Sequence, residues 1–297
     1  MFRFAVVMAV VVVLAGTSVG QQSQVNPHPG DFGLYEYASI TAEHDSSIGW
    51  ASELNSGVGY SFNDNFALEA GVPFFLVTTT ASTATSSTQT TATRSNSLGD
   101  FYARLNANRP SDILTYNTSL TATAPTGDTS AGISTGRATV NWDNRMEHDF
   151  GRMTPFAEGS IGNSLGNSLK YKRSYTTLGA ASEFRGGMGL NLHKNVGVEA
   201  SAYADVGYGN QKLYSRSVRK GTNGTGNPKH PRPFDTSYLS TGTASLVEDR
   251  GLSADLSLTP FPRMNLDLTY NHSIHFALDS VSATVGIKLG HLGKTSE

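Results

Sequence analysis

The sequence predicts an all-β fold: a transmembrane antiparallel up-and-down β-barrel of about 12 strands. Three observations support this prediction. The chain begins with an export signal, its apolar and polar residues alternate along short segments, and these segments are joined by short and long links in turn. Alternating segments of about ten residues are typical of strands that cross an outer membrane.

The N-terminal segment has the layout of a cleaved secretory signal peptide. Arg3 provides a basic start, 4–16 is an apolar run, and small residues follow up to Gly20. The run has about 13 residues, fewer than the roughly 20 that an α-helix needs to span a bilayer, which disfavours the alternative of a membrane anchor. We therefore expect 1–20 to be a signal peptide and 21–297 to form the barrel.

Composition narrows the class of protein. Only 15% of the residues are charged, whereas about a quarter is usual for a soluble protein. No second apolar run is long enough for a spanning helix. The chain contains no cysteine, which excludes disulfides and thiolate metal sites. The net charge of −2 gives no indication of a nucleic-acid partner.

Period-two alternation defines the predicted strands. They lie at 32–42, 47–62, 66–77, 98–108, 113–124, 137–149, 154–164, 181–192, 196–208, 245–259, 265–276 and 280–290. In 196–208, for example, Val198, Ala200 and Ala202 alternate with Glu199 and Ser201. Successive side chains on a strand point to opposite faces, so one face is apolar and the other polar. The apolar face is predicted to contact hydrocarbon, and Val140, Val198, Leu256 and Val285 are examples.

The links between these segments alternate in length. The short links are at 63–65, 109–112, 151–153, 193–195 and 261–264, and the long polar links are at 78–97, 125–137, 165–180 and 211–237. Short periplasmic turns opposite long external loops are typical of outer-membrane barrels, and they favour a barrel over a soluble β-sandwich. We therefore expect the protein in the bacterial outer membrane, with both termini in the periplasm.

The loops and the strand ends support further expectations. The stretch 78–96 is almost entirely Thr, Ser and Ala and is predicted to be a mobile external loop. The basic link 211–237 is predicted to be a solvated loop, or alternatively a contact for lipopolysaccharide phosphates. Aromatic residues near the strand ends are predicted to form two interface girdles: Phe62, Phe66, Phe150 and Phe156 at one end, and Trp50, Phe74 and Phe276 at the other.

Two short motifs resemble a known family. Ser97-Leu98-Gly99-Asp100-Phe101 opens a predicted strand, and the segment APTGD at 124–128 is followed by STGR at 134–137. Both are similar to segments of outer-membrane channels of the MetA-pathway phenol-degradation type. In layout the resemblance extends over roughly residues 55–290. It implies a transporter of small, often hydrophobic or aromatic solutes.

Charged residues occupy the predicted lumen face. They are Glu69, Asp100, Arg104, Asp143, Arg145, Glu147, Glu158, Glu183, Arg185, Glu199, Asp205, Asp255, Asp267 and Lys288. Those close to a short turn form a predicted belt near the periplasmic mouth, which we call the turn-proximal belt: Glu69, Arg104, Arg145, Glu147, Glu158, Glu199, Asp255, Asp267 and Lys288. The belt is either an ion-pair network that fills the barrel or a constriction that selects solutes. Since acids outnumber bases, an open pore would prefer cations.

The sequence offers little for catalysis. His272 and Ser273 are neighbours on one predicted strand and therefore point to opposite faces, so they cannot act as base and nucleophile. His148 is predicted on the lipid side. There is no GxSxG or HExxH motif, and no cofactor or metal is expected.

The predicted function is therefore passage of small solutes through a polar, charged lumen, by a protein that is not an enzyme. Its partners are the solute, outer-membrane lipid and lipopolysaccharide. The alternatives are a structural or adhesive barrel with a plugged lumen and, less favoured, an outer-membrane hydrolase.

Overall fold

Strands make up most of the described residues of the computed structural model, which are 32–45, 49–82, 90–127, 134, 136–163, 179–213, 218–219, 234–235, 240–261, 263–275 and 277–291. The predicted signal peptide lies outside the described residues. Within them the only helix is the 3₁₀ turn η1 (Ala244–Leu246). No helix in these ranges is long and apolar enough to cross a membrane.

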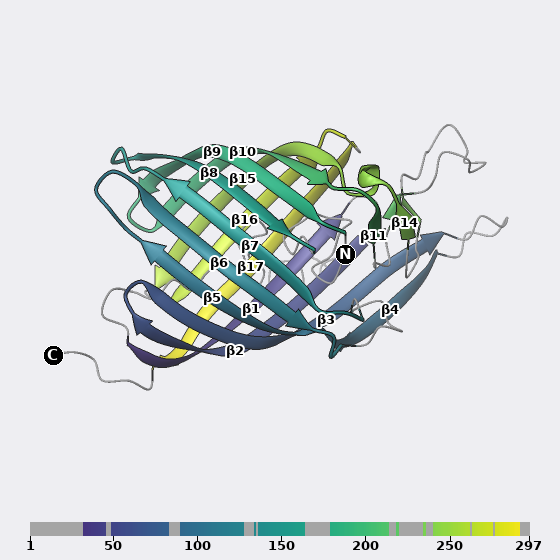
Figure 1. Cartoon of the computed structure of the whole chain (residues 1–297), viewed down its shortest axis with the longest axis horizontal. Helices are drawn as coiled ribbons and strands as arrows, with labels where there is room; N and C mark the ends of the chain where they lie inside the picture. Colours follow the sequence, from purple (N-terminus) through teal and green to yellow (C-terminus); the bar gives the residue numbers. More distant parts are fainter. Residues whose placement is uncertain are drawn as a thin grey trace, which may run out of the picture.

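The strands form a closed antiparallel barrel (Figure 1). Its wall consists of β1 (Gly33–Asp45), β2 (Gly49–Asn63), β3 (Phe66–Ser82), β4 (Thr90–Leu98), β5 (Phe101–Arg109), β6 (Thr115–Ala124), β7 (Thr139–Glu147), β8 (Met153–Gly162), β9 (Ala181–His193), β10 (Val196–Gly207), β15 (Asp249–Phe261), β16 (Met264–Ser273) and β17 (Leu278–His291). Both β4 and β5 pair with β3, on either side of a break at Gly99 and Asp100, so they are two halves of one wall strand. The prediction of 12 strands is confirmed.

Four short strands lie outside the barrel wall. The link between β10 and β15 contains β11 (Gln211–Leu213), β12 (Val218–Arg219), β13 (Phe234–Asp235) and β14 (Ser240–Gly242). In it β11 pairs with β14 and β12 pairs with β13, so these strands form two small sheets separate from the wall.

Pairing between the first and last strands closes the wall. β1 pairs with β17 along nearly its whole length, from Tyr35 opposite His291 to Asp45 opposite Ser280. The Thr41 and Thr284 hydroxyls form a hydrogen bond of 2.6 Å across this seam. Closure leaves no open sheet edge in hydrocarbon, where unpaired backbone groups would cost several kcal/mol each.

The two faces of the wall are reversed relative to a soluble protein. Large apolar side chains such as Leu120, Val140 and Ile161 are exposed on the outside, whereas Ser119, Thr139 and Thr284 are buried inside. The predicted lipid face is confirmed at Val140. Val285, whose direct cross-strand neighbours are Ile40 and Leu266, is only 9% exposed, so exposure does not confirm its assignment to the lipid face. This is the fold and exterior of an outer-membrane barrel.

The two ends differ as the link lengths predicted. The short turns gather at one end, which β1 leaves and to which β17 returns, since Tyr35 is opposite His291. The strand ends that the longer connections join lie at the other end (Figure 1). The prediction of a mobile loop at 78–96 is wrong for 78–82 and 90–96, which are paired strand residues of β3 and β4 with Thr79 opposite Thr93; 83–89 lie outside the described residues. Threonine is β-branched and favours strands, so these segments form strands despite their low-complexity composition.

The girdle prediction holds in part. Phe62, Phe66 and Phe150 at the short-turn end and Trp50 at the other end are exposed on the outside. Phe156 was wrongly assigned, since it is only 6% exposed. It lies two residues before Glu158 on β8 and therefore shares its lumen face. Phe276 lies outside the described residues.

Candidate functional site

Aromatic rings line the lumen directly opposite glycines. Tyr35 is opposite Gly59 across β1 and β2, and a Cβ atom on Gly59 would lie 2.2 Å from Tyr35 Cζ. The same arrangement places Tyr37 over Gly57, Tyr102 over Gly71, Tyr203 over Gly251 and Phe156 over Gly187. Glycine is required in these pairs because any side chain would overlap the ring. The sequence alone does not reveal this feature, because it depends on strand register.

A tyrosine-rich cluster surrounds the Glu69–Arg104 ion pair. Arg104 Nη1 lies 3.5 Å from Glu69 Oε2, and the Tyr35 hydroxyl donates to Glu69 Oε1 over 2.9 Å. The hydroxyls of Tyr37 and Tyr102 are also hydrogen-bonded to each other. Lys288 Nζ sits 4.8 Å from the centre of the Tyr35 ring. All these groups are buried, so this part of the wall is packed rather than open.

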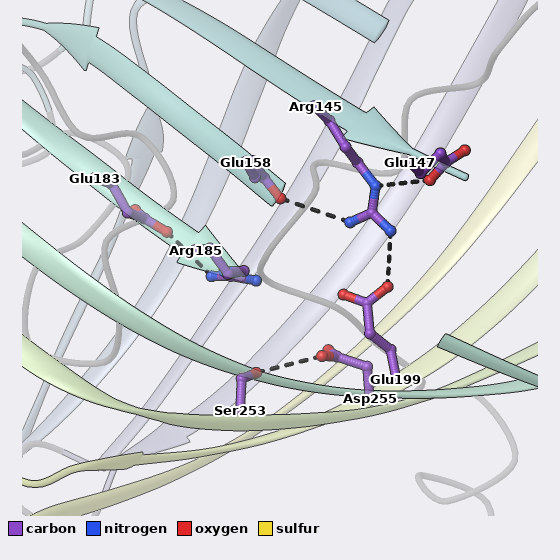
Figure 2. A network of polar contacts seen from close by, with 8 residues as sticks. All are labelled: Arg145, Glu147, Glu158, Glu183, Arg185, Glu199, Ser253 and Asp255. Atoms are coloured by element: carbon purple, nitrogen blue, oxygen red, sulfur yellow. Dashed lines mark hydrogen bonds and ion pairs between the residues drawn. The ribbon is translucent and has the colours of Figure 1, made fainter. Parts of the chain in front are cut away.

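A second cluster is built around Arg145 (Figure 2). Its Nε lies 2.9 Å from Glu147 Oε2, its Nη2 lies 2.8 Å from Glu199 Oε2, and its Nη1 lies 3.6 Å from Glu158 Oε2. Its Cζ is 3.9 Å from the centre of the Phe156 ring. Glu199 is on β10, two strands beyond β8. Arg145 therefore spans part of the lumen instead of pairing only with its neighbours.

A third group, on β9, lies beside the second. Arg185 Nη2 is 3.1 Å from Glu183 Oε1, two residues away on the same face. Figure 2 shows this pair next to Glu158, with Asp255 below it. Asp255 accepts hydrogen bonds from Thr269 Oγ1 at 2.5 Å and from Ser253 Oγ at 3.3 Å.

The turn-proximal belt is thus divided. The structure brings Arg145, Glu147, Glu158 and Glu199 together, with Asp255 nearby. Four other members lie elsewhere: Glu69 and Arg104 pair with each other, Asp267 accepts a hydrogen bond from Asn265, and Lys288 lies over Tyr35. The Glu183–Arg185 pair lies farther from a short turn and is therefore not part of the predicted belt.

The two motifs that resemble the channel family meet at the break between β4 and β5. Asp100 Oδ1 accepts hydrogen bonds from Gly127 N at 3.0 Å and from Ser134 Oγ at 2.6 Å. Phe101 N donates to Thr126 Oγ1 over 2.8 Å. Asp100, predicted as a lumen charge, therefore holds the loop after β6 against the wall.

Acids dominate the lumen face of the described strands. To the predicted acids the structure adds Glu43, Glu53 and Asp249, each on the same face as its polar neighbours two residues away. Asp249 accepts from the Tyr203 hydroxyl at 3.1 Å and from Ser273 Oγ at 2.6 Å. The bases on that face are the four already predicted: Arg104, Arg145, Arg185 and Lys288. The chain's small net charge therefore conceals a strongly acidic lumen.

The two histidines considered for catalysis lie apart from this network. His272 Nδ1 is 2.9 Å from Asp279 Oδ1 on the outer face, whereas Ser273 is buried inside. His148 Nδ1 contacts the carbonyl oxygen of Ile113 near a short turn. In the described ranges, no group of His, Cys, Asp or Glu side chains is arranged to hold a metal ion.

Comparisons place the fold among outer-membrane barrels. The sequence matches no known family profile, and no curated protein is significantly similar to it. An outer membrane channel from Pseudomonas putida F1 has a TM-score of 0.55 at 9% identity, over 91% of this chain and 99% of that chain. The KdgM porin has a TM-score of 0.47 at 8% identity, over 86% of this chain and 99% of that chain. The Pseudomonas putida toluene transporter TodX has a TM-score of 0.40 at 9% identity, over 92% and 95%.

Proposed function

We propose that the protein is an outer-membrane channel that passes small solutes and prefers cations. The observation that carries this proposal is the excess of acids over bases on the lumen face. Charges of one sign that line a passage with low-dielectric walls raise the local concentration of opposite ions. The narrow lumen of a 12-stranded barrel strengthens this effect.

The Arg145 cluster is the best candidate for the constriction. The side chains of Glu147 and Glu199 are 27% and 23% exposed, whereas those of Glu69 and Arg185 are each 2% exposed. Because the first two carboxylates retain access to the lumen, they can meet a passing solute. The buried pairs Glu69–Arg104 and Glu183–Arg185 are instead expected to support the wall.

The solute class has two sources of support. The acidic lumen favours polar cations, while the resemblance to channels of the MetA-pathway phenol-degradation type favours hydrophobic or aromatic molecules. Among the described residues, the lumen aromatics are buried against glycines and offer little apolar surface. We therefore infer that charge, more than apolar contact, selects the solute. Contact with lipopolysaccharide stays a prediction.

The test replaces Glu158 and Glu199 together by Gln, which removes two charges and keeps hydrogen-bonding groups. The reversal potential is measured in planar bilayers under a salt gradient and should move toward that of a non-selective pore. The matched control is Glu36→Gln, an exposed carboxylate on the outer side of β1, which should leave selectivity unchanged. An unmoved reversal potential in a conducting double variant would contradict the constriction.

A plugged structural barrel is the second candidate. It is favoured by the dense packing of the Glu69–Arg104 and Glu183–Arg185 pairs, whose side chains are nearly inaccessible. If the lumen is filled, the purified refolded barrel will not conduct. The Gln double variant will then lower only the midpoint of unfolding.

A further inference from the structure

Arg145 occupies a site shaped for a guanidinium group. Each guanidinium nitrogen faces a different carboxylate: Nε faces Glu147, Nη2 faces Glu199 and Nη1 faces Glu158. The Phe156 ring lies 3.9 Å from Cζ. Planar donors that match carboxylates, together with an aromatic face, distinguish a guanidinium from an ammonium group. We call Glu147, Glu158, Glu199 and Phe156 the guanidinium cage.

Arg145 leaves one carboxylate oxygen of the cage without a hydrogen bond. Glu158 Oε2 is buried and accepts no hydrogen bond in the described structure, because Arg145 Nη1 is 3.6 Å away. Nearby, Arg185 Nε is buried and also makes no hydrogen bond within the described residues. A buried acceptor that lacks a donor is costly, so a ligand that supplies a closer donor to Glu158 gains relative to Arg145.

The cage is also reachable. Glu147 is the last residue of β7 and Glu199 is the fourth of β10, so both lie near the short-turn mouth. Their partial exposure opens the cage to the lumen. Once displaced, Arg145 can form an ion pair with Asp143, which lies two residues earlier on the same face of β7.

We propose that the guanidinium cage is a binding site for guanidinium-bearing solutes and that Arg145 is its built-in competitor. Arg145 occupies the cage when no solute is present, and a solute guanidinium takes its place during passage. This inference rests on the proposed channel function and names the solute class at the same constriction.

The test compares three ligands that share a butyl chain and differ in their head group: N-butylguanidinium, n-butylammonium and N-butylurea. Binding is measured by titration calorimetry on the full refolded chain in detergent micelles. In Arg145→Ala the competitor is removed, so butylguanidinium should bind at least tenfold more tightly than to the unaltered protein. Butylammonium should bind more weakly than butylguanidinium because it lacks the planar donors, and the neutral butylurea should not bind.

Second variants assign the effect to the cage. Adding Glu199→Gln to Arg145→Ala should abolish the gain, whereas adding Glu36→Gln on the outer face should preserve it. Equal binding of butylguanidinium to the unaltered protein and to Arg145→Ala would overturn the proposal. So would equal binding of butylurea, or a gain that survives Glu199→Gln.

Two further measurements test the proposal if Arg145→Ala does not fold. If Arg145→Ala does not fold alone, its heat-modifiable gel band should reappear in millimolar butylguanidinium and not in butylurea. If neither ligand restores it, Arg145→Lys should bind butylguanidinium more tightly than the unaltered protein does, and no gain there would overturn the proposal. Calorimetry requires no conduction, so absent cation preference would count against the channel function alone, and absent binding against the cage.

Discussion

Gly59 offers a sharp test of how the lumen wall is packed. In Gly59→Ala the new methyl group would lie 2.2 Å from Tyr35 Cζ and 2.5 Å from its hydroxyl oxygen. Gly59 does not have a positive φ, so only the ring opposes the substitution. The ring must move, and its hydrogen bond to Glu69 Oε1 is lost. Overpacking costs about 1–3 kcal/mol and a hydrogen bond to a charged acceptor contributes about 1.5–3 kcal/mol, so we expect a loss of about 2.5–6 kcal/mol.

The assay is equilibrium urea unfolding in lipid vesicles, followed by tryptophan fluorescence. The matched control is Gly189→Ala, where the nearest atom would be Thr154 O at 3.5 Å, an ordinary contact. That variant should stay within about 1 kcal/mol of the unaltered protein. In a Tyr35→Ala background the cost of Gly59→Ala should nearly vanish, because the obstructing ring is absent. A cost that persists without the ring, or equals that of the control, refutes the reasoning.

Three further predictions concern the lipid face, the contacts of Asp100 with the loop after β6, and the buried Glu69–Arg104 ion pair. Leu120→Arg should lower the free energy of unfolding in vesicles by about 2–4 kcal/mol, and Ile113→Arg, in an exposed turn, by about 1 kcal/mol or less; equal costs would contradict the assigned depth. Asp100→Ala should release the loop after β6, measured as faster proteolytic cleavage of that loop. Asp100→Asn keeps an acceptor and should be cleaved more slowly than Asp100→Ala; identical cleavage of the two variants would argue against a role of Asp100 in holding the loop. Arg104→Met should cost about 3 kcal/mol in urea unfolding because it leaves Glu69 buried without its base, and adding Glu69→Gln should recover most of that loss.

The sequence predicted the strands well because two environments act on each of them. Lipid on one side and the lumen on the other impose the alternation seen along β10 and β15, and no helical period reproduces it. Link lengths then distinguished the two ends. The prediction failed at 78–82 and 90–96, where composition alone suggested a loop although the two segments pair with each other as strands.

The site was less predictable because distance from a turn gives depth but not position around the barrel. Arg145 and Glu199 have similar depth, and they meet only because the lumen is narrow enough for a side chain to cross two strands. Lys288 has similar depth but lies on another part of the wall, over Tyr35. The glycine pairs were equally hidden, since Tyr35 and Gly59 become neighbours only in the observed register.

The seam between β1 and β17 has a consequence for biogenesis. Every other pairing joins wall strands that follow one another along the chain, whereas Thr41 and Thr284 on the first and last strands are separated by 243 positions. Closing such a long segment is entropically slow, so the hairpins should form early and the seam last. Until then both edges carry unpaired backbone groups that hydrocarbon cannot satisfy. A nascent chain that stops before β17 therefore has no stable partial barrel to occupy, and insertion should be an all-or-none event timed by arrival of the last strand.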